Sequence, residues 1–506
     1  MDTVYTQYAQ PEDARPLADP IPGYTEPAWN ATIASVSSIS ALTNAITAAG
    51  TTPRIIELTS NITMSGAQIT IPKTSVIFIR GSGGTQRTID AQNLSRIFYN
   101  RGTLFLQNVR LINGDATKSG SSISDQNGGG VYSYSQNTDP SNPLLVIRAD
   151  TEISSCHATY GGGVAQQDGR GMESTVRTYV EGGLFTKNTA AYRGGAFYMY
   201  QDYLSIANAT ITENDSGNGG AINADSLRTL EIKNSTISNN TARSDGAALY
   251  AFNSGLITIS DSSLTGNKAS RFGGAISSHA EIVITNTLID NNESADNGGA
   301  IYMRNYPLTV TGTSVVSNNT SGVNGGAIYA QNEGSVYTVT VSVSGAARIT
   351  TNRAVDGGGI YIKSTRGATW GPYISTLNVS GNAVIDNNTA TGGGGGIYTE
   401  LDSVLNVSGS AQLLNNTAAG DGGAIYFDHA NLEKLGVSAG VTFANNAASR
   451  SADRSSSDDA TYYAHIFATQ WTSPFTQGYN NYDIAYDPPP SPDYTATKTA
   501  DKATAI

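Results

Sequence analysis

The chain has 506 residues, of which only 14% are charged, and it contains 55 glycines and 27 tyrosines. Average soluble proteins have about 25% charged residues, and helical bundles need far more Ala, Glu, Lys and Leu, so this composition favours a β-rich extracellular protein. The formal net charge of −12 repels phosphate backbones and argues against nucleic acid as a partner. No run approaches the roughly 20 apolar residues that span a bilayer.

The first part of the chain predicts a polar N-terminal extension followed by a short helix. Residues 1–36 read as an N-terminal extension whose start lacks the basic and apolar regions of a secretory signal, so we expect the signal to lie outside this sequence. Residues 37–53 predict a helix and a turn, with Ile39, Leu42 and Ile46 on one apolar face and Gly50 as the stop. The open end of a solenoid requires a cap, and this helix is expected to supply it.

Short alternating runs follow, and they predict strands with one buried face. The runs from Ile69 to Ile71 and from Leu104 to Leu106 are typical of an irregular stretch up to about residue 110. Beyond it the runs recur regularly, as from Ile257 to Ile259. Each repeat holds about three such strands and no helix, which predicts a three-sided β-solenoid over residues 54–446.

The repeat consists of a pair of small residues followed by an apolar residue. It recurs at intervals between 25 residues (Phe197 to Ile222) and 37 residues (Ile360 to Ile397). The apolar positions are Val131, Val164, Phe197, Ile222, Leu249, Ile276, Ile301, Ile328, Ile360, Ile397 and Ile425. Stacked coils lie about 4.8 Å apart, so these residues are expected to form one ladder in the core. The glycines before them predict turns with positive φ or a close backbone approach.

A second motif, apolar-x-x-Asn, lies shortly before most of the glycine pairs. Its asparagines are Asn188, Asn214, Asn240, Asn267, Asn292, Asn319, Asn352, Asn388, Asn416 and Asn446. Asparagine tolerates left-handed turns, and stacked amides can hydrogen-bond from coil to coil. Cys156, the single cysteine, takes this position in its own coil, which predicts a small buried thiol in place of one rung.

Together, the two motifs resemble the polymorphic outer-membrane protein repeat of chlamydial adhesins and related surface proteins. Both are present literally, as Gly194 to Phe197 and Phe185 to Asn188, and the resemblance covers residues 110 to 446. It implies a right-handed parallel β-helix that serves as an adhesin passenger. The capping helix and early strands also look like the start of pectate-lyase-like β-helices. The expected fold class is therefore all-β, a right-handed parallel β-helix (β-solenoid) with a short N-terminal capping helix.

The end of the chain predicts a cap and a linker. Residues 447–486 are polar at first and then dense in aromatic residues, which predicts a C-terminal cap. Residues 487–506 begin with prolines at 488–490, which form a stiff spacer. The stretch 494–501 resembles the first strand of immunoglobulin-like stalk repeats in Gram-positive surface proteins. The resemblance implies a stalk and a cell-wall anchor outside this sequence.

Tyrosine often follows the buried apolar residue and is expected to point outward. The positions are Tyr132, Tyr198, Tyr250, Tyr302, Tyr329, Tyr361, Tyr398 and Tyr426, with Ala165, Asn223 and Ser277 as interruptions. One interpretation is a ladder of rings that stabilises the sheet surface. The other is an aromatic platform for sugars or a partner protein, with Tyr329, Tyr361 and Tyr398 as candidate contacts.

The longer repeats gain their extra residues directly after this tyrosine strand. The insertions lie around residues 133–144, 165–175, 331–336 and 364–374. Insertions at one turn of a solenoid stack along one side, which is often the binding side. The last insertion carries Arg366, Trp370 and Tyr373, which form the main candidate contact cluster.

The sequence offers little for catalysis. Glycoside hydrolysis uses two carboxylates about 5–10 Å apart, whereas the repeat acids are mostly single and precede glycine, as Asp245 and Asp356 do, which is typical of turn caps. The four histidines have no metal-ligand spacing. We therefore predict no catalytic, cofactor-binding or metal-binding residues; calcium is not indicated but stays open.

These observations predict a non-catalytic adhesin-type passenger domain at the extracellular cell surface. Its expected partner is a glycan or a protein on a host or neighbouring cell, with no nucleic acid and no membrane-spanning segment. One alternative is a secreted polysaccharide lyase or glycoside hydrolase on the same fold. The other is a structural spacer or a self-associating surface filament subunit.

Overall fold

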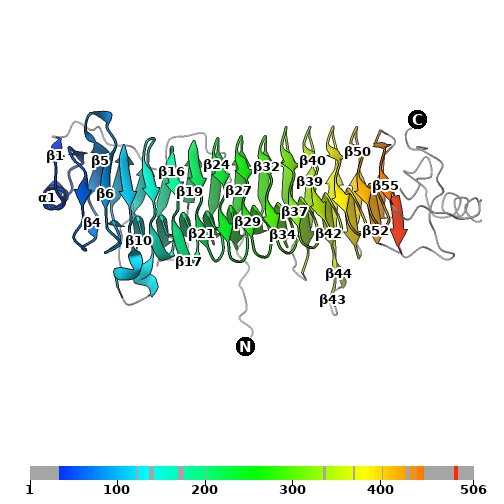
Figure 1. Cartoon of the computed structure of the whole chain (residues 1–506), viewed down its shortest axis with the longest axis horizontal. Helices are drawn as coiled ribbons and strands as arrows, with labels where there is room; N and C mark the ends of the chain where they lie inside the picture. Colours follow the sequence, from blue (N-terminus) through cyan, green and yellow to red (C-terminus); the bar gives the residue numbers. More distant parts are fainter. Residues whose placement is uncertain are drawn as a thin grey trace, which may run out of the picture.

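The protein forms a long rod of stacked coils, with α1 (Ile39–Ala49) at one end (Figure 1). The computed structural model describes residues 33–120, 123–135, 142–168, 176–201, 203–333, 338–367, 371–401, 403–428, 434–438, 440–448 and 484–487. Four long sheets of parallel strands run along the rod, and the expected right-handed parallel β-helix is confirmed.

A full coil contributes one strand to each of the four sheets, which we call A, B, D and C in chain order. Sheet A contains β1 (Ala34–Val36), β2 (Arg54–Leu58), β5 (Val76–Gly81), β8 (Thr103–Gln107), β11 (Leu144–Ile147), β15 (Arg177–Val180), β19 (Tyr203–Ala207), β23 (Thr229–Lys233), β27 (Leu256–Ser260), β31 (Ile282–Thr285), β35 (Leu308–Thr311), β39 (Val339–Val343), β45 (Ser375–Val379), β49 (Val404–Val407) and β53 (Leu435–Val437). Sheet B contains β3 (Ile62–Thr63), β6 (Arg87–Asp90), β9 (Val109–Ile112), β12 (Glu152–Ser154), β16 (Gly183–Thr186), β20 (Ala209–Thr212), β24 (Thr236–Ser238), β28 (Ser263–Thr265), β32 (Leu288–Asp290), β36 (Val315–Ser317), β40 (Arg348–Thr350), β46 (Val384–Asp386), β50 (Gln412–Leu414) and β54 (Thr442–Ala444).

The other two sheets complete each coil. Sheet D contains β13 (His157–Tyr160), β17 (Thr189–Arg193), β21 (Asp215–Ser216), β25 (Thr241–Ala242), β29 (Lys268–Ala269), β33 (Glu293–Ser294), β37 (Thr320–Ser321), β41 (Arg353–Ala354), β47 (Thr389–Ala390), β51 (Thr417–Ala418) and β55 (Ala447–Ala448). Sheet C contains β4 (Ile69–Ile71), β7 (Phe98–Asn100), β10 (Val131–Ser135), β14 (Val164–Asp168), β18 (Phe197–Tyr200), β22 (Ile222–Asp225), β26 (Leu249–Phe252), β30 (Ile276–His279), β34 (Ile301–Arg304), β38 (Ile328–Gln331), β42 (Ile360–Lys363), β48 (Ile397–Glu400), β52 (Ile425–Asp428) and β56 (Ile484–Asp487).

Sheet D is the difference from the three-strand coil that the sequence predicts. Most of its strands are only two residues long, with the first side chain exposed and the second buried, as in β25 and β29. The buried position is a small residue such as Ala242 or Ala269. Two residues with a small inward side chain are too short to show a period-two pattern, so the fourth side is invisible in the sequence.

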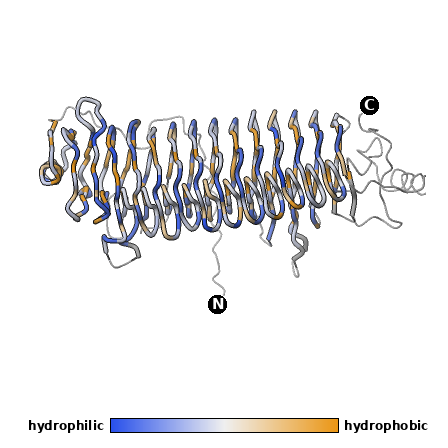
Figure 2. Tube along the Cα trace, viewed as in Figure 1, coloured by the Kyte–Doolittle hydropathy of each residue, from blue (hydrophilic) through white to orange (hydrophobic). Residues whose placement is uncertain are grey.

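The apolar repeat positions form the expected ladder in the core. Ile276, Ile301 and Ile328 pair in register across sheet C, and all three are fully buried. Apolar and polar segments alternate around every coil (Figure 2). The interior is thus one continuous apolar column along the rod.

The predicted asparagine ladder is confirmed, and Asn319 shows the geometry of one rung. Its Nδ2 donates to Oδ1 of Asn352 at 2.9 Å and to the Ile289 carbonyl at 3.1 Å. Its Oδ1 accepts from both Nδ2 and the backbone N–H of Asn292, at 2.9 Å each. All four hydrogen-bonding positions of the amide are therefore satisfied away from water. Hydrogen bonds between side-chain amides join each ladder asparagine to the next, from Asn188 to Asn446.

The left-handed residue of this turn is the one before the ladder asparagine. Lys187, Asn318 and Thr351 have φ of 57°, 54° and 56°. At the glycine pair, Gly325 has φ of 67°, whereas a Cβ on the next residue, Gly326, would lie 2.2 Å from the Gly358 carbonyl oxygen of the neighbouring coil. The first glycine thus serves the turn, and the second permits close stacking.

The N-terminal cap is confirmed as a helix. The Ser38 side chain accepts from the Ala41 N–H at 3.2 Å, Gly50 ends the helix with φ of 57°, and Leu42 and Ile46 are buried against the first coils. The strand β1 is an addition, because it joins sheet A from a segment that we assigned to the extension. At the other end, β56 pairs with β52. Of the predicted C-terminal cap (447–486) and linker (487–506), the structure describes β55 and β56; the other residues lie outside the described part of the chain.

Candidate binding site at the insertion corner

The four predicted insertions leave the rod at one edge. Each connects a sheet C strand to the next sheet A strand: β10 to β11, β14 to β15, β38 to β39 and β42 to β45. We call this edge the insertion corner. Because the strands stack in order along both sheets, the insertions share one side of the rod, as the sequence predicts. Parts of them, at 136–141, 169–175, 334–337 and 368–370, lie outside the described residues.

One insertion forms a hairpin that stands out from the rod (Figure 1). Its strands β43 (Thr365–Gly367) and β44 (Gly371–Tyr373) are antiparallel, and Arg366 pairs with Pro372 through the backbone. Tyr373 is half-buried at the base. Trp370 lies outside the described residues, and the Arg366 side chain is likewise not described. Of the predicted contact cluster, the backbone of Arg366 and Tyr373 thus lies on one projecting hairpin, while the mutual geometry of the cluster stays a prediction.

The predicted tyrosine column exists as a layer of stacked rings outside the core. The stack runs through Phe272, Tyr302, Tyr329, Tyr361, Tyr398 and Tyr426, with centroid separations of 4.5, 5.4, 5.1, 4.8 and 4.5 Å and interplanar angles of at most 16°. Aromatic pairs at such separations add to the stability of the sheet beyond their area burial. The ladder interpretation is thus confirmed for these coils.

These rings face away from the core, yet half of them are hidden from solvent. Tyr302, Tyr329 and Tyr361 are only 4 to 5% exposed, and burial raises the pKa of each phenol well above its usual value. Tyr398 is half-buried, and a Cβ at Gly393 in the neighbouring turn would lie 3.3 Å from its ring. The ring faces of Tyr329 and Tyr361 are occupied by other rings, so they do not form the open platform that we considered.

The hydroxyl ends of the tyrosines reach the insertion corner. Tyr329 donates to Gln331 Oε1 at 2.8 Å, and Tyr361 donates to the Glu400 carboxylate. Lys363 Nζ also donates to Glu400, at 2.8 Å. Gln331, Lys363 and Glu400 are the last residues of their sheet C strands, directly before the corner. The corner therefore has a polar rim backed by a rigid aromatic stack.

Two interruptions of the tyrosine column are filled by rings from the preceding turn. At Ala165 the ring comes from Tyr160, whose centroid lies 4.9 Å from that of Tyr198. At Ser277 it comes from Phe272. Each of these aromatic residues stands directly before the first glycine of its own coil, which is a signal that sequence reasoning missed. The third interruption, Asn223, is fully buried, and its amide has no hydrogen-bond partner among the described residues.

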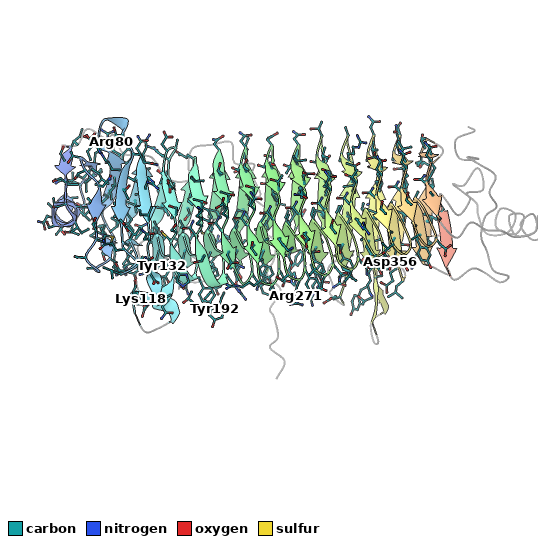
Figure 3. All side chains as sticks on the ribbon, in the orientation of Figure 1. Arg80, Lys118, Tyr132, Tyr192, Arg271 and Asp356 are labelled. Atoms are coloured by element: carbon teal, nitrogen blue, oxygen red, sulfur yellow. The ribbon has the colours of Figure 1, made fainter. Side chains whose placement is uncertain are left out.

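A second projecting segment was also missed. It lies between sheets B and C and contains η2 (Ala116–Lys118) and η3 (Ile123–Gln126). Figure 3 labels Lys118 of this segment beside Tyr132, on the lower side of the rod. The signal was the long spacing from Asn113 to Gly128, since other coils need only a few residues between the asparagine turn and the glycine pair.

The buried guanidinium of Arg96 holds this segment in place. Arg96 is 3% exposed, and it donates to the Asn127 carbonyl at 2.8 Å, to Gln68 Oε1 at 2.7 Å and to the Asp125 carbonyl. Its guanidinium carbon also lies 4.9 Å from the Tyr132 ring centroid. Burial lowers the pKa of Arg96 to about 10, so the side chain stays charged at neutral pH.

The repeat acids serve as turn caps, as the sequence predicts. Asp245 Oδ1 accepts the Phe272 N–H at 3.2 Å, and Asp356 Oδ1 accepts the Gly393 N–H at 2.7 Å, each from the next coil. Burial raises the pKa of both carboxyl groups. In the part of the chain that the structure describes, no three His, Cys, Asp or Glu side chains are grouped as metal ligands would be.

Comparison with known families supports this fold and its repeats. Residues 107–288 match the model of the right handed beta helix region, and residues 286–304, 313–331, 382–400 and 410–428 match the Chlamydia polymorphic membrane protein repeat. The resemblance to polymorphic outer-membrane protein repeats is thereby confirmed, and it indicates a β-helix of the surface-protein kind. Neither the curated proteins nor the solved structures contain a significant match to the chain. Among the described residues, no helix is long and apolar enough to cross a membrane.

Proposed function

We propose that this β-helix is the non-catalytic passenger domain of an extracellular adhesin and that it binds at the insertion corner. The collection of four insertions on one edge of the rod is the observation that carries the proposal. A rigid solenoid that carries several insertions at one corner presents these loops side by side, and such loops are where binding residues concentrate. The polymorphic membrane protein repeats support a place at the cell surface.

The chemistry of the corner suits a glycan or a polar protein surface. The rim includes carboxylate, ammonium and amide groups at Glu400, Lys363 and Gln331, and the sequence of the neighbouring insertion contains Arg366, Trp370 and Tyr373. Aromatic residues with a few convergent polar groups are the usual means of binding sugars and partner proteins. The stacked tyrosines behind the rim make it rigid, which limits the entropy lost on binding.

The test is binding of the chain to a glycan array and to host or neighbouring cells. Tyr373→Ala and Trp370→Ala should each weaken binding at least tenfold. Tyr192→Ala is the matched control, because Tyr192 is 56% exposed on sheet D, away from the insertion corner, and its loss should leave binding unchanged. A chain that binds no glycan and no cell surface would refute the proposal.

The enzyme and spacer alternatives give different outcomes in the same system. Release of unsaturated or reducing sugars from a polysaccharide panel would establish a polysaccharide-active enzyme. A spacer would bind nothing, and replacing residues 364–374 with the short linker of another coil, 253–255, would leave its behaviour unchanged. For an adhesin the shortened hairpin should abolish binding and keep the melting temperature.

A further inference from the structure

The outward face of sheet A changes character along the rod. One column of side chains, in register from strand to strand, runs through Ile55, Phe78, Phe105, Val146, Tyr179, Ser205, Glu231 and Thr258. Its first five members are apolar or aromatic, whereas the later members are polar. We call the positions from Ile55 to Tyr179 the apolar stripe.

The apolar stripe faces away from the core. In β5, Ile77 and Ile79 belong to the core, and Phe78 between them points to the opposite face because side chains alternate along a strand. The stripe residues pack with one another in a cluster separate from the core. Nevertheless, Phe105 and Val146 are fully buried. An outward column is normally half exposed, as Ser205 and Glu231 of the same column are, so the stripe is covered.

Arginines form part of the cover. The Arg148 guanidinium lies 5.3 Å from the Phe78 ring centroid and 5.2 Å from that of Phe105. Arg80, which Figure 3 labels near the N-terminal end of the rod, lies 5.8 Å from the Phe78 ring. The surface is therefore an aromatic strip edged with arginines, which also pair with acids of neighbouring strands: Arg80 with Glu57 at 2.6 Å and Arg148 with Glu181 at 3.3 Å.

We infer that the segment before β1, residues 1–32, docks along the apolar stripe and shields it from solvent. The chain enters the fold at β1, which pairs directly with β2, and β2 carries Ile55 at the start of the stripe. From Ile55 to Tyr179 the stripe crosses four coil steps of about 4.8 Å, or about 19 Å. At about 3.1 Å per residue in an extended, proline-rich chain, six or seven residues span that length, well within the 32 residues available.

The composition of residues 1–32 fits this surface. The segment contains Pro11, Pro16, Pro20, Pro22 and Pro27. Proline-rich chains lose little entropy on binding, and they dock on aromatic grooves without needing a strand partner. The apolar side chains Leu17, Ile21 and Tyr24 stand between the prolines, and Trp29 follows the last of them. The acids Asp2, Glu12, Asp13, Asp19 and Glu26 outnumber the single basic residue, Arg15, and complement the arginine edges of the stripe.

Such a segment protects the rod from self-association. Without its cover, a strip of Ile, Phe and Val on a flat sheet face would be a surface on which a second copy could pack. A tethered cover blocks that contact, because its effective concentration at the stripe is in the millimolar range. This inference is independent of the adhesin proposal, since it concerns sheet A and not the insertion corner.

The full chain tests the inference through Trp29. In the variant Trp370→Phe with Trp471→Phe, Trp29 is the sole tryptophan. Its emission should be blue-shifted and protected from acrylamide, and adding Val146→Glu should shift the emission to the red and raise the quenching constant at least twofold. Ser205→Glu, in the polar part of the same column, is the matched control and should change neither. A Trp29 as accessible as free tryptophan in the parent variant would overturn the inference.

A truncated chain beginning at residue 33 gives a second test. It should bind a hydrophobic dye that the full chain does not bind, and a synthetic peptide of residues 1–32 should suppress the dye signal. Peptide binding should weaken at least threefold when Asp13, Asp19 and Glu26 are changed to their amides, and it should weaken with added salt. Absence of peptide binding by a folded truncated chain, or a dimer that forms equally in the full chain, would contradict the docking.

Discussion

Cys156 stands 32 residues before Asn188, yet its backbone N–H donates to Asn188 Oδ1 at 3.1 Å, so the cysteine is the first rung of the asparagine ladder. Its Sγ lies 3.8 Å from the Leu111 carbonyl, in the place where Asn188 Nδ2 bonds the Ile153 carbonyl at 2.8 Å. Cys156→Asn should therefore extend the ladder and stabilise the protein by about 1 kcal/mol. The denaturation midpoint measures this, with Cys156→Ser as a control that should not stabilise. A less stable asparagine variant would show that the site of Cys156 has no room for the larger asparagine side chain.

The same thiol reports the opening of its coil. Burial raises the pKa of Cys156 to about 12, and only the thiolate is reactive. The native protein should thus resist a thiol reagent at pH 8 and react fully once unfolded. The labelling rate under mild denaturant should track local unfolding of the coil. Fast labelling of the native protein would contradict the burial of this rung.

Loss of a middle rung should cost far more than loss of its neighbour. Asn319→Ala removes the oxygen that accepts from the backbone N–H and from one Nδ2–H of Asn292, and it removes the donor to the Ile289 carbonyl, at about 3 kcal/mol in total in a dry interior. Asn318→Gly is the control, because glycine adopts the positive φ of that exposed position freely. Since repeat arrays open locally, hydrogen exchange around sheet B is the proper measurement. Equal protection in the two variants would show that the ladder contributes little.

The tyrosine stack should behave as a structural layer. Tyr361→Ala removes a ring that stacks on Tyr329 and Tyr398, and the cost should be about 3 kcal/mol or more. Tyr361→Phe keeps the stack and loses only the hydrogen bond to Glu400, at about 1 kcal/mol. Thermal unfolding followed by near-ultraviolet circular dichroism distinguishes the two. An alanine variant as stable as the phenylalanine variant would show that the ring layer contributes little to the stability of the rod.

His279 should make stability fall in mild acid. Burial, with Arg304 nearby, lowers the pKa of His279 to about 4, so the folded chain keeps the ring neutral below pH 6.5 while the unfolded chain takes up a proton. The stability that this creates is complete above pH 6.5 and is lost as the pH falls toward 4, at no more than about 1.4 kcal/mol per pH unit. His279→Gln should lack this part of the slope in unfolding curves taken between pH 7 and 4.5. Parallel slopes for the two proteins would contradict it.

Much of the architecture could be predicted because each coil repeats the same local requirements. An inward Ile, an asparagine turn and a glycine pair recur with every coil, and each has one physical reason: burial, amide satisfaction and backbone proximity. Positions that satisfy these needs from outside the repeat could not be predicted. Tyr160 and Phe272 fill gaps at Ala165 and Ser277 from a neighbouring turn, and only their distances to other rings reveal it.

The location of the candidate site could be predicted from the sequence, but the solvent exposure of its side chains could not. Insertion lengths placed it at one corner, since turns at equivalent positions must stack. The strand pattern places the tyrosines on the outer face, yet Tyr302, Tyr329 and Tyr361 are buried there, because rings of neighbouring coils stack on them. Alternation along a strand specifies which face a side chain takes, but it carries no information on what covers that face.

The apolar stripe on sheet A shows the same division. By itself, the sequence determined the parallel β-helix, its ladders and the side on which its loops collect. The reason is that residues at equivalent positions of successive repeats stack in a row along the rod. Only the tertiary structure decided that sheet D is a fourth side, that the tyrosine rings are shielded and that Phe105 is buried on an outer face. Those outcomes depend on contacts between segments that are not equivalent positions of the repeat. Such contacts are determined by how the side chains pack, and the sequence pattern does not show them.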